Sequence, residues 1–132
     1  MTTPPDATLT ISARVTLADF RRYDSTREDP NFSAIDADQY IVWLNHQHPG
    51  RTYRLPTSQE YDDFNLNIAT WEWTSDVEDP HRVVRGGSFY GGHSMRAALR
   101  YRRYPDDRYD VIGFRVVVFL RNAELPGENR SR

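Results

Sequence analysis

Residues 82–89 read RVVRGGSF, and residues 112–117 read IGFRVV. Both stretches carry β-branched residues, which favour strands, and glycine, which permits a tight exit from a strand. The second stretch continues into an apolar run that ends at Leu120. With the aromatic WEWT at 71–74, the pattern predicts strands at residues 71–74, 82–84, about 97–101 and 113–120.

Toward the N-terminus the pattern changes from strands to helices. Capping pairs three residues apart predict two main helices, one beginning after Thr16 with Asp19 in its first turn. The other begins near Asp36, with Gln39 completing a D-x-x-Q arrangement. A T-x-x-E pair at 57–60 predicts a brief third helix.

The order of these elements indicates the fold class. Residues 9–13 alternate apolar and polar side chains, which predicts an initial strand buried on one face. With helices next and most strands last, the order favours an α+β fold with a mostly antiparallel sheet. At 132 residues the chain has material for one hydrophobic core.

Composition limits the range of functions. No stretch approaches the ~20 apolar residues that span a bilayer, and residues 1–10 lack the basic and apolar regions of a secretory signal. We therefore expect a cytoplasmic protein with no membrane insertion. The absence of cysteine removes disulfides, thiolate metal sites and thiol nucleophiles. All 17 basic residues are arginine, and eight of them lie in the segment from Arg82 to Arg115. The net charge of the whole chain is nevertheless −2.

A series of motifs runs along the chain in a fixed order. It reads VTLADF at 15–20, DQYIVWL at 38–44, YRLPTSQEY at 53–61 and WEWTSD at 71–76, followed by RVVRGGSF and IGFRVV. From about residue 9 to 120 the series resembles the formylglycine-generating-enzyme (sulfatase-modifying factor) family. The resemblance implies a single minimal C-type-lectin-like domain at 8–122, after a flexible lead-in at 1–7 and before a loose tail at 123–132.

The resemblance does not extend to the chemistry of that family. Members that oxidise a substrate cysteine hold copper with their own cysteines after the RGGS motif, and this chain has none. Members that bind iron for sulfur transfer draw histidines from an additional domain. We therefore expect no catalytic residues and no enzyme, with an oxidase remnant as the alternative. No hydrolase triad can be assigned around Ser88.

Metal sites receive little support from the sequence. His46 and His48 lie two residues apart, which is not the i, i+4 spacing of a helical metal pair. The resemblance implies a calcium site of carbonyls and a carboxylate near WEW, where Glu72 stands. However, Ala69 occupies the position where the family usually has asparagine, so no resident cofactor is expected.

Between RGGS and GFR the chain is most similar to the variable proteins of diversity-generating retroelements. Their framework reads approximately R-x-A-x-R-x-R-x-x-P-D-x-R-x-x-x-I-G-F-R, which matches residues 96–115. Twelve positions of the region at about 89–111, named in the next sentence, hold residues that an AAC codon reaches by changing adenines only. The resemblance assigns ligand binding to these variable positions: Tyr90, Gly91, His93, Ser94, Leu99, Tyr101, Arg103, Tyr104, Asp107, Tyr109, Asp110 and Val111.

The tyrosines of this region indicate the kind of ligand. A rigid amphipathic ring gives a large contact area with few rotamers to order, so Tyr90, Tyr101, Tyr104 and Tyr109 favour a protein or peptide ligand. Alternatively, Tyr101 and the neighbouring Leu99 belong to the core. For the arginines at 96, 100, 102 and 108 we expect a framework role, in pairs with acids such as Glu72 or Asp76.

Nucleic acid is the alternative partner. Arginine and tyrosine alternate in RYRRY at 100–104, as they do in proteins that bind single strands. The nearby Asp106, Asp107 and Asp110 would repel phosphate, so nucleic acid is less favoured.

Overall fold

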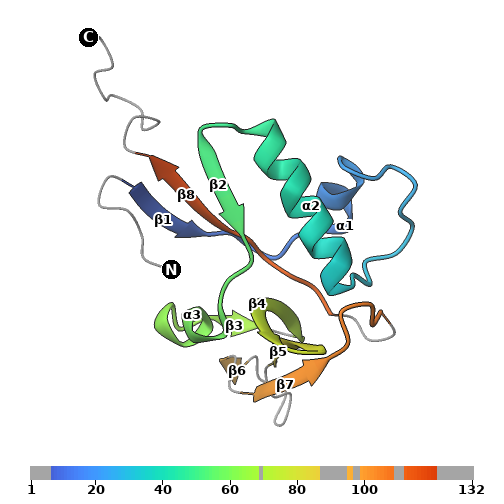
Figure 1. Ribbon diagram of the computed structural model, residues 1–132, viewed down its shortest axis with the longest axis vertical. Helices are drawn as coiled ribbons and strands as arrows, with labels where there is room; N and C mark the ends of the chain where they lie inside the picture. Colours follow the sequence, from blue (N-terminus) through green and yellow to red (C-terminus); the bar gives the residue numbers. More distant parts are fainter. Residues whose placement is uncertain (1–6, 69, 87–94, 97–98, 109–111, 122–132) are drawn as a thin grey trace.

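The computed structural model describes residues 7–68, 70–86, 95–96, 99–108 and 112–121 (Figure 1). One three-stranded antiparallel sheet has the order β1-β8-β2, formed by β1 (Ala7–Ile11), β8 (Val117–Arg121) and β2 (Arg51–Arg54). The central strand pairs Phe119 with Leu9 on one side and with Thr52 on the other. The two ends of the chain thus meet in one sheet, with β1 beginning at the last residue of the expected lead-in. Apart from Ala7, the lead-in and the tail at 123–132 lie outside the described residues.

A second three-stranded antiparallel sheet carries the segment on which the sequence analysis centres. Its order is β4-β5-β7, formed by β4 (Glu72–Glu78), β5 (His81–Gly86) and β7 (Leu99–Arg103). Two short strands, β3 (Asn67–Ile68) and β6 (Met95–Arg96), pair antiparallel beside it. Together with the three helices of the described residues, these sheets confirm the α+β class.

All three described helices begin with a reciprocal capping box. Thr16 caps α1 (Leu17–Arg21) and Thr57 caps α3 (Ser58–Asp63), with Asp19 and Glu60 as partners, as the sequence predicts. The predicted start of the second helix was wrong. Ser33, with Asp36 as its partner, caps α2 (Ala34–Gln47), so Asp36 lies inside the first turn.

The strip at 112–116 connects the two three-stranded sheets. Gly113 donates its N–H to the carbonyl of Trp71, and its carbonyl accepts the N–H of Trp73. The carbonyls of Phe114 and Val116 accept the N–H groups of Val15 and Ser12, respectively. The sequence predicts a strand from 113, but β8 begins only at Val117, because the strip is shared between two neighbours. The other predicted strands also shift: β4 continues to Glu78, β7 runs from Leu99 to Arg103, and β3 and β6 were missed.

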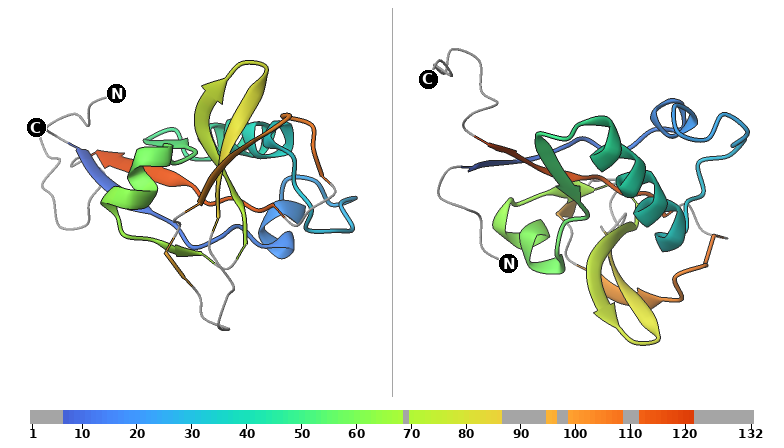
Figure 2. Two further views of the ribbon diagram at one scale, coloured as in Figure 1. Left: turned by 90° about the horizontal axis from the view of Figure 1, so that it is seen from below. Right: turned by 45° about the horizontal axis from the view of Figure 1, so that its top comes forward.

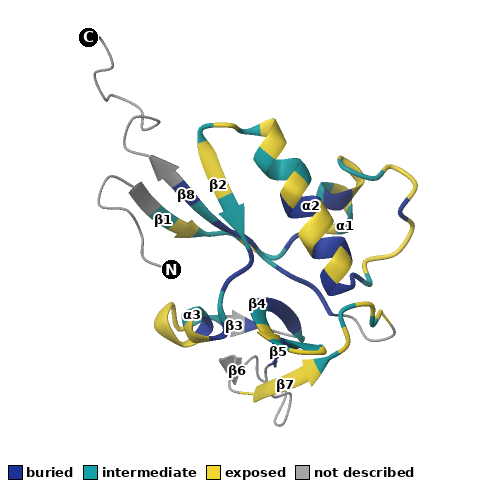
Figure 3. Cartoon of the chain, viewed as in Figure 1, coloured by how far each residue is buried: buried dark blue, intermediate teal, exposed yellow. Residues whose placement is uncertain are grey.

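An aromatic cluster fills the space beneath α2. Phe20, Phe32, Tyr40 and Phe114 pack against one another with ring centroids 4.7 to 5.7 Å apart. The indole of Trp73 is fully buried and donates to the carbonyl of Phe32 at 2.8 Å. In Figure 3 the buried parts of the backbone include parts of α2, β4 and the strip at 112–116, whereas β7 is mostly exposed, and Figure 2 shows β7 beside the β4–β5 hairpin. None of the helices in the described ranges combines the length and the apolar character that a bilayer span requires.

The corrected helix start yields a test. Replacing Ser33 with alanine should lower the free energy of unfolding by about 1 kcal/mol, because the N–H of Asp36 loses its cap. Gln39→Ala, at the exposed position that the sequence predicts as the capping partner, is the control and should change stability by less than about 0.5 kcal/mol. Urea unfolding of both variants measures this. A larger loss in the Gln39 variant would contradict the observed cap.

Candidate functional site

The outer strand β7 and the turn after it expose large side chains. Leu99, Tyr101 and Tyr104 keep 46%, 59% and 53% of their surface accessible, and Figure 3 shows β7 as an exposed strand. The alternative that Leu99 and Tyr101 belong to the core is therefore wrong. Arg103 and Asp107, two more of the predicted variable positions, are half-buried beside them.

Ring contacts hold the two tyrosines in place at the surface. Tyr101 lies 6.3 Å from the half-buried ring of Trp71, and the guanidinium of Arg103 lies 5.9 Å from the Tyr101 centroid. The Tyr104 ring lies 4.5 Å from the imidazole of His81. His81 is the first residue of β5 and therefore lies next to the end of β7.

These side chains surround a hollow of 310 Å³. His81, Arg102 and Asp107 contribute to its wall together with the two tyrosines and Arg103. The carboxylate of Asp107 accepts the backbone N–H of Tyr104 at 3.0 Å, which fixes the turn at one end of the hollow. The hollow therefore combines aromatic faces with cationic groups. The sequence did not predict that His81 and Arg102 line one hollow, because only the pairing of β5 with β7 brings these residues together.

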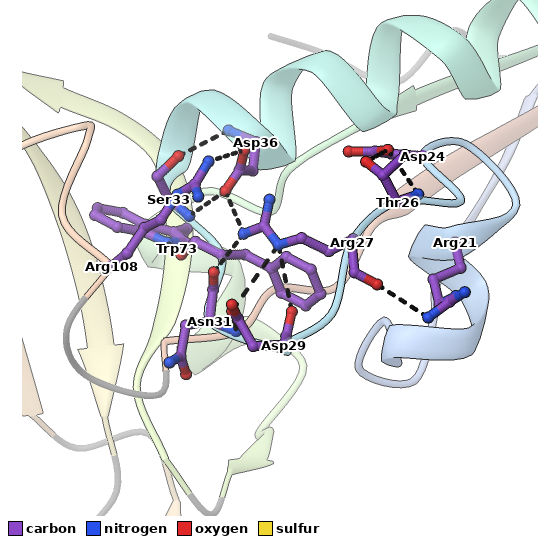
Figure 4. A network of polar contacts seen from close by, with 11 residues as sticks. Arg21, Asp24, Thr26, Arg27, Asp29, Asn31, Ser33, Asp36, Trp73 and Arg108 are labelled. Atoms are coloured by element: carbon purple, nitrogen blue, oxygen red, sulfur yellow. Dashed lines mark hydrogen bonds and ion pairs between the residues drawn. The ribbon is translucent and has the colours of Figure 1, made fainter.

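The segment after the hollow is held by the buried carboxylate of Asp36 (Figure 4). Arg108 donates to one of its oxygens at 2.9 Å, and the buried Arg27 donates to the other at 2.8 Å. The same carboxylate accepts the N–H of Ser33 at the helix cap. One acid thus joins the start of α2, the loop at 24–33 and the end of the variable segment.

The electrostatics of this network favour the charged form of Asp36. Burial opposes ionisation, but the hydrogen bonds from Arg27 and Ser33 and the charges of Arg27 and Arg108 outweigh it and lower the pKa of Asp36. The carboxylate is therefore ionised at neutral pH, and both guanidinium groups keep their partner.

A second buried carboxylate, Glu72, lies at the beginning of β4 with 1% of its surface exposed. Arg115 donates to both of its oxygens, at 2.7 and 2.9 Å, and Tyr61 donates to it at 2.8 Å. Arg14 lies 3.6 Å from the same group. Burial and the neighbouring Glu72 charge raise the pKa of Tyr61 well above its ordinary value, so its hydroxyl stays protonated and can donate.

The calcium site that the resemblance implies does not fit this geometry. A calcium site needs several carboxylate and carbonyl oxygens with lone pairs available for the ion. Here both oxygens of Glu72 are bound by Arg115, and Arg14 adds a second positive charge next to them. Within the described ranges, no three histidine, aspartate or glutamate side chains gather as metal ligands.

Arg100 and Arg102, for which the sequence predicts a framework role, also lie near an acid, but this acid is not one of the two that were expected. Arg100 and Arg102 both lie near Glu78, at the end of β4. The predicted partners Glu72 and Asp76 were wrong for Arg100, Arg102 and Arg108, since Glu72 is held by Arg115 and Arg14. The expected role of Arg96 is not tested, because the structure describes its backbone in β6 but not its side chain.

Arg85, from the RGGS motif, supports β7 from below. Its buried guanidinium donates to the Ser58 carbonyl at 2.7 Å, to Asp62 at 2.8 Å and to the carbonyl of Leu99 at 3.3 Å. It therefore connects α3 to the first residue of β7. At the following residue, Gly86, an added Cβ would lie 2.5 Å from the ring of Trp71, so that position needs glycine.

Several predicted site residues fall outside the part of the chain that the structure describes. The expectation of ligand binding at these positions is therefore not tested: Tyr90, Gly91, His93, Ser94, Tyr109, Asp110 and Val111.

Comparisons of the chain with family models, with curated proteins and with solved structures gave no match. The description of the site therefore rests on its own geometry.

The Asp36 network predicts a pH-dependent stability. Asp36→Asn should lower the free energy of unfolding at pH 7 by roughly 3 kcal/mol, since two arginines lose a charged partner. A lowered pKa stabilises the fold above the ordinary pKa, about 3.9, and this contribution is lost as pH falls through the native value. The difference from the original protein should therefore shrink between pH 5 and pH 2.

Urea unfolding across that pH range measures this effect. Asp38→Asn provides the control, because Asp38 lies on the same helix, is half-exposed and pairs with Arg82. It should cost less than about 1 kcal/mol. An Asp36→Asn difference that is the same at all pH values would contradict the account.

Proposed function

We propose that the chain is a non-enzymatic ligand-binding protein with a C-type-lectin-like fold, specifically the variable protein of a diversity-generating retroelement. Its diversified surface would be the region at 89–111, of which β7 and the following turn are described. The α+β arrangement of helices and antiparallel sheets is compatible with such a domain.

The observation that carries the proposal is a division of labour along residues 99–115. Four positions that the resemblance assigns to the framework are tied to the fold, since Arg108 and Arg115 bind buried carboxylates and Ile112 and Phe114 are buried. The framework residues Arg100 and Arg102 lie nearer the surface, beside Glu78. The variable positions Leu99, Tyr101 and Tyr104 instead project large side chains into solvent. A segment selected only for folding would have little reason to expose these three large side chains in one place.

The chemistry of the exposed groups suits recognition of a protein or peptide. Tyr101 and Tyr104 offer rigid rings with a polar tip, and contacts with Trp71 and His81 already restrict their motion. Little conformational entropy would then be lost on binding. The thiolate chemistry of the resembling oxidases is excluded for this chain, which has no cysteine.

Single-stranded nucleic acid is a second candidate ligand, favoured by one observation. Tyr101 and Tyr104 are exposed and flank Arg102 and Arg103 in the sequence, so stacking faces and cations occur in one short segment. Asp106 and Asp107 at the same turn oppose a polyphosphate. Protein or peptide is therefore the first choice.

The DNA that flanks the coding sequence provides the test. We expect a reverse transcriptase gene and a near-copy of the codons for residues 90–111 close by. The near-copy should carry adenines at the codons of Leu99, Tyr101 and Tyr104, where the expressed copy has other bases. Codons of framework positions such as Arg100 and Arg108 should be identical in the two copies and serve as the internal control. A complete flanking sequence that contains neither element would overturn the proposal.

A further inference from the structure

We infer that the hollow beside Tyr101 and Tyr104 binds a carboxylate side chain, so that the ligand is a protein or peptide with an exposed acidic segment. The inference rests on the proposed function, because it names the chemistry that the exposed surface would recognise. It depends on the groups that line the hollow: His81, Tyr101, Arg102, Arg103, Tyr104 and Asp107.

The charge of the lining favours an anion. Arg102 and Arg103 are two basic residues of the lining, and Tyr101, Tyr104 and His81 carry further groups that can donate hydrogen bonds. Among the described lining residues the acid is Asp107, which already accepts the backbone N–H of Tyr104. A guanidinium binds a carboxylate through two parallel hydrogen bonds, which are among the stronger contacts available at a protein surface.

The present partner of Arg102 can be exchanged at low cost. Its Nε lies 3.8 Å from Glu78, and its side chain keeps 60% of its surface exposed. An exposed ion pair of this length contributes little to stability. Glu78 would still have Arg100, with which it also pairs. Arg102 can therefore turn to an incoming carboxylate without leaving Glu78 unpaired.

The dimensions of the hollow indicate a side chain and not a whole cofactor. At 310 Å³ it lies at the lower end of the range for small-molecule sites, about 300–1,000 Å³. The rings of Tyr101 and Tyr104 can cover the methylene groups of a glutamate while the guanidinium groups hold its carboxylate. Both rings are more than half exposed, so an extended segment could pass over them.

An acidic peptide fits the charges around the hollow better than nucleic acid does. A nucleic acid strand presents phosphates at regular spacing, and it would meet Asp107 in the lining, the exposed Asp106 beside it and Glu78 next to Arg102. A single carboxylate side chain places one negative charge near Asp107, whereas a nucleic acid strand would place several. The neighbours of that side chain in a peptide can be neutral.

The test is an NMR titration of the isotope-labelled full chain with two matched peptides. One is a short peptide of alternating glutamate and serine, and the other has glutamine in place of every glutamate. We expect the amide signals at 101–104 to shift with the glutamate peptide and its affinity to exceed that of the glutamine peptide by about tenfold, the value of a charge-assisted hydrogen bond.

Variants locate the binding groups. Arg102→Gln and Arg103→Gln should each weaken binding of the glutamate peptide by about tenfold. Arg22→Gln is the matched control: it removes the same charge from an exposed arginine at the end of α1, which does not line the hollow. It should change the affinity less than about twofold. Melting temperatures verify that the variants fold, and the two peptides on the original protein decide the matter if one does not.

Each alternative outcome is decisive. Equal affinity for the two peptides, no shift with either at millimolar concentration, or unchanged binding in both Arg102→Gln and Arg103→Gln would overturn the inference. Tighter binding of a single-stranded thymidine oligonucleotide, with a steep salt dependence, would assign the hollow to nucleic acid. These results leave the test of the proposed function untouched, since a near-copy in the flanking DNA is found or absent whatever the hollow binds.

Discussion

The carboxylate of Glu72 is almost completely removed from water, and separate segments of the chain supply the groups that compensate it. Arg115 reaches it from the strip at 112–116, Tyr61 from α3 and Arg14 from the segment after β1. Without such partners the buried carboxylate would lower the free energy of unfolding by several kcal/mol. The fold therefore requires these segments to meet at β4. This constraint also explains Gly113, where an added Cβ would lie 2.2 Å from Nε of Arg14.

The same type of contact recurs toward the variable segment. Arg108 binds Asp36 at the start of α2, and Arg85 binds Ser58 and Asp62 of α3 while it donates to the backbone of β7. These arginines hold β7 and its turn through charge and hydrogen bonds. The segment therefore needs few of its own apolar side chains in the core, and Tyr101 and Tyr104 remain available at the surface.

Much of the fold follows from local signals, and the rest depends on contacts between distant segments. The boxes at Thr16 and Thr57 were predictable because capping is decided within one helical turn. Asp36 misled the prediction because it could belong to two different capping boxes, and only its contacts with the buried Arg27 and the half-exposed Arg108 reveal which one forms. The alternation of framework and variable positions did not indicate which variable positions face solvent, and the structure shows this for Leu99, Tyr101 and Tyr104. The partners of the arginines and the position of His81 could not be derived, since strand pairing sets them.

The central claim is that the variable positions on β7 and its turn tolerate replacement, whereas the framework positions that bind buried carboxylates or lie in the core do not. Protease resistance of two displayed libraries tests it most directly. One library randomises residues 99, 101, 103, 104 and 107, and the other randomises Arg108 and residues 112–115. The account predicts that most clones of the first library remain folded and resist cleavage, while most clones of the second do not. Equal resistant fractions in the two libraries would contradict it.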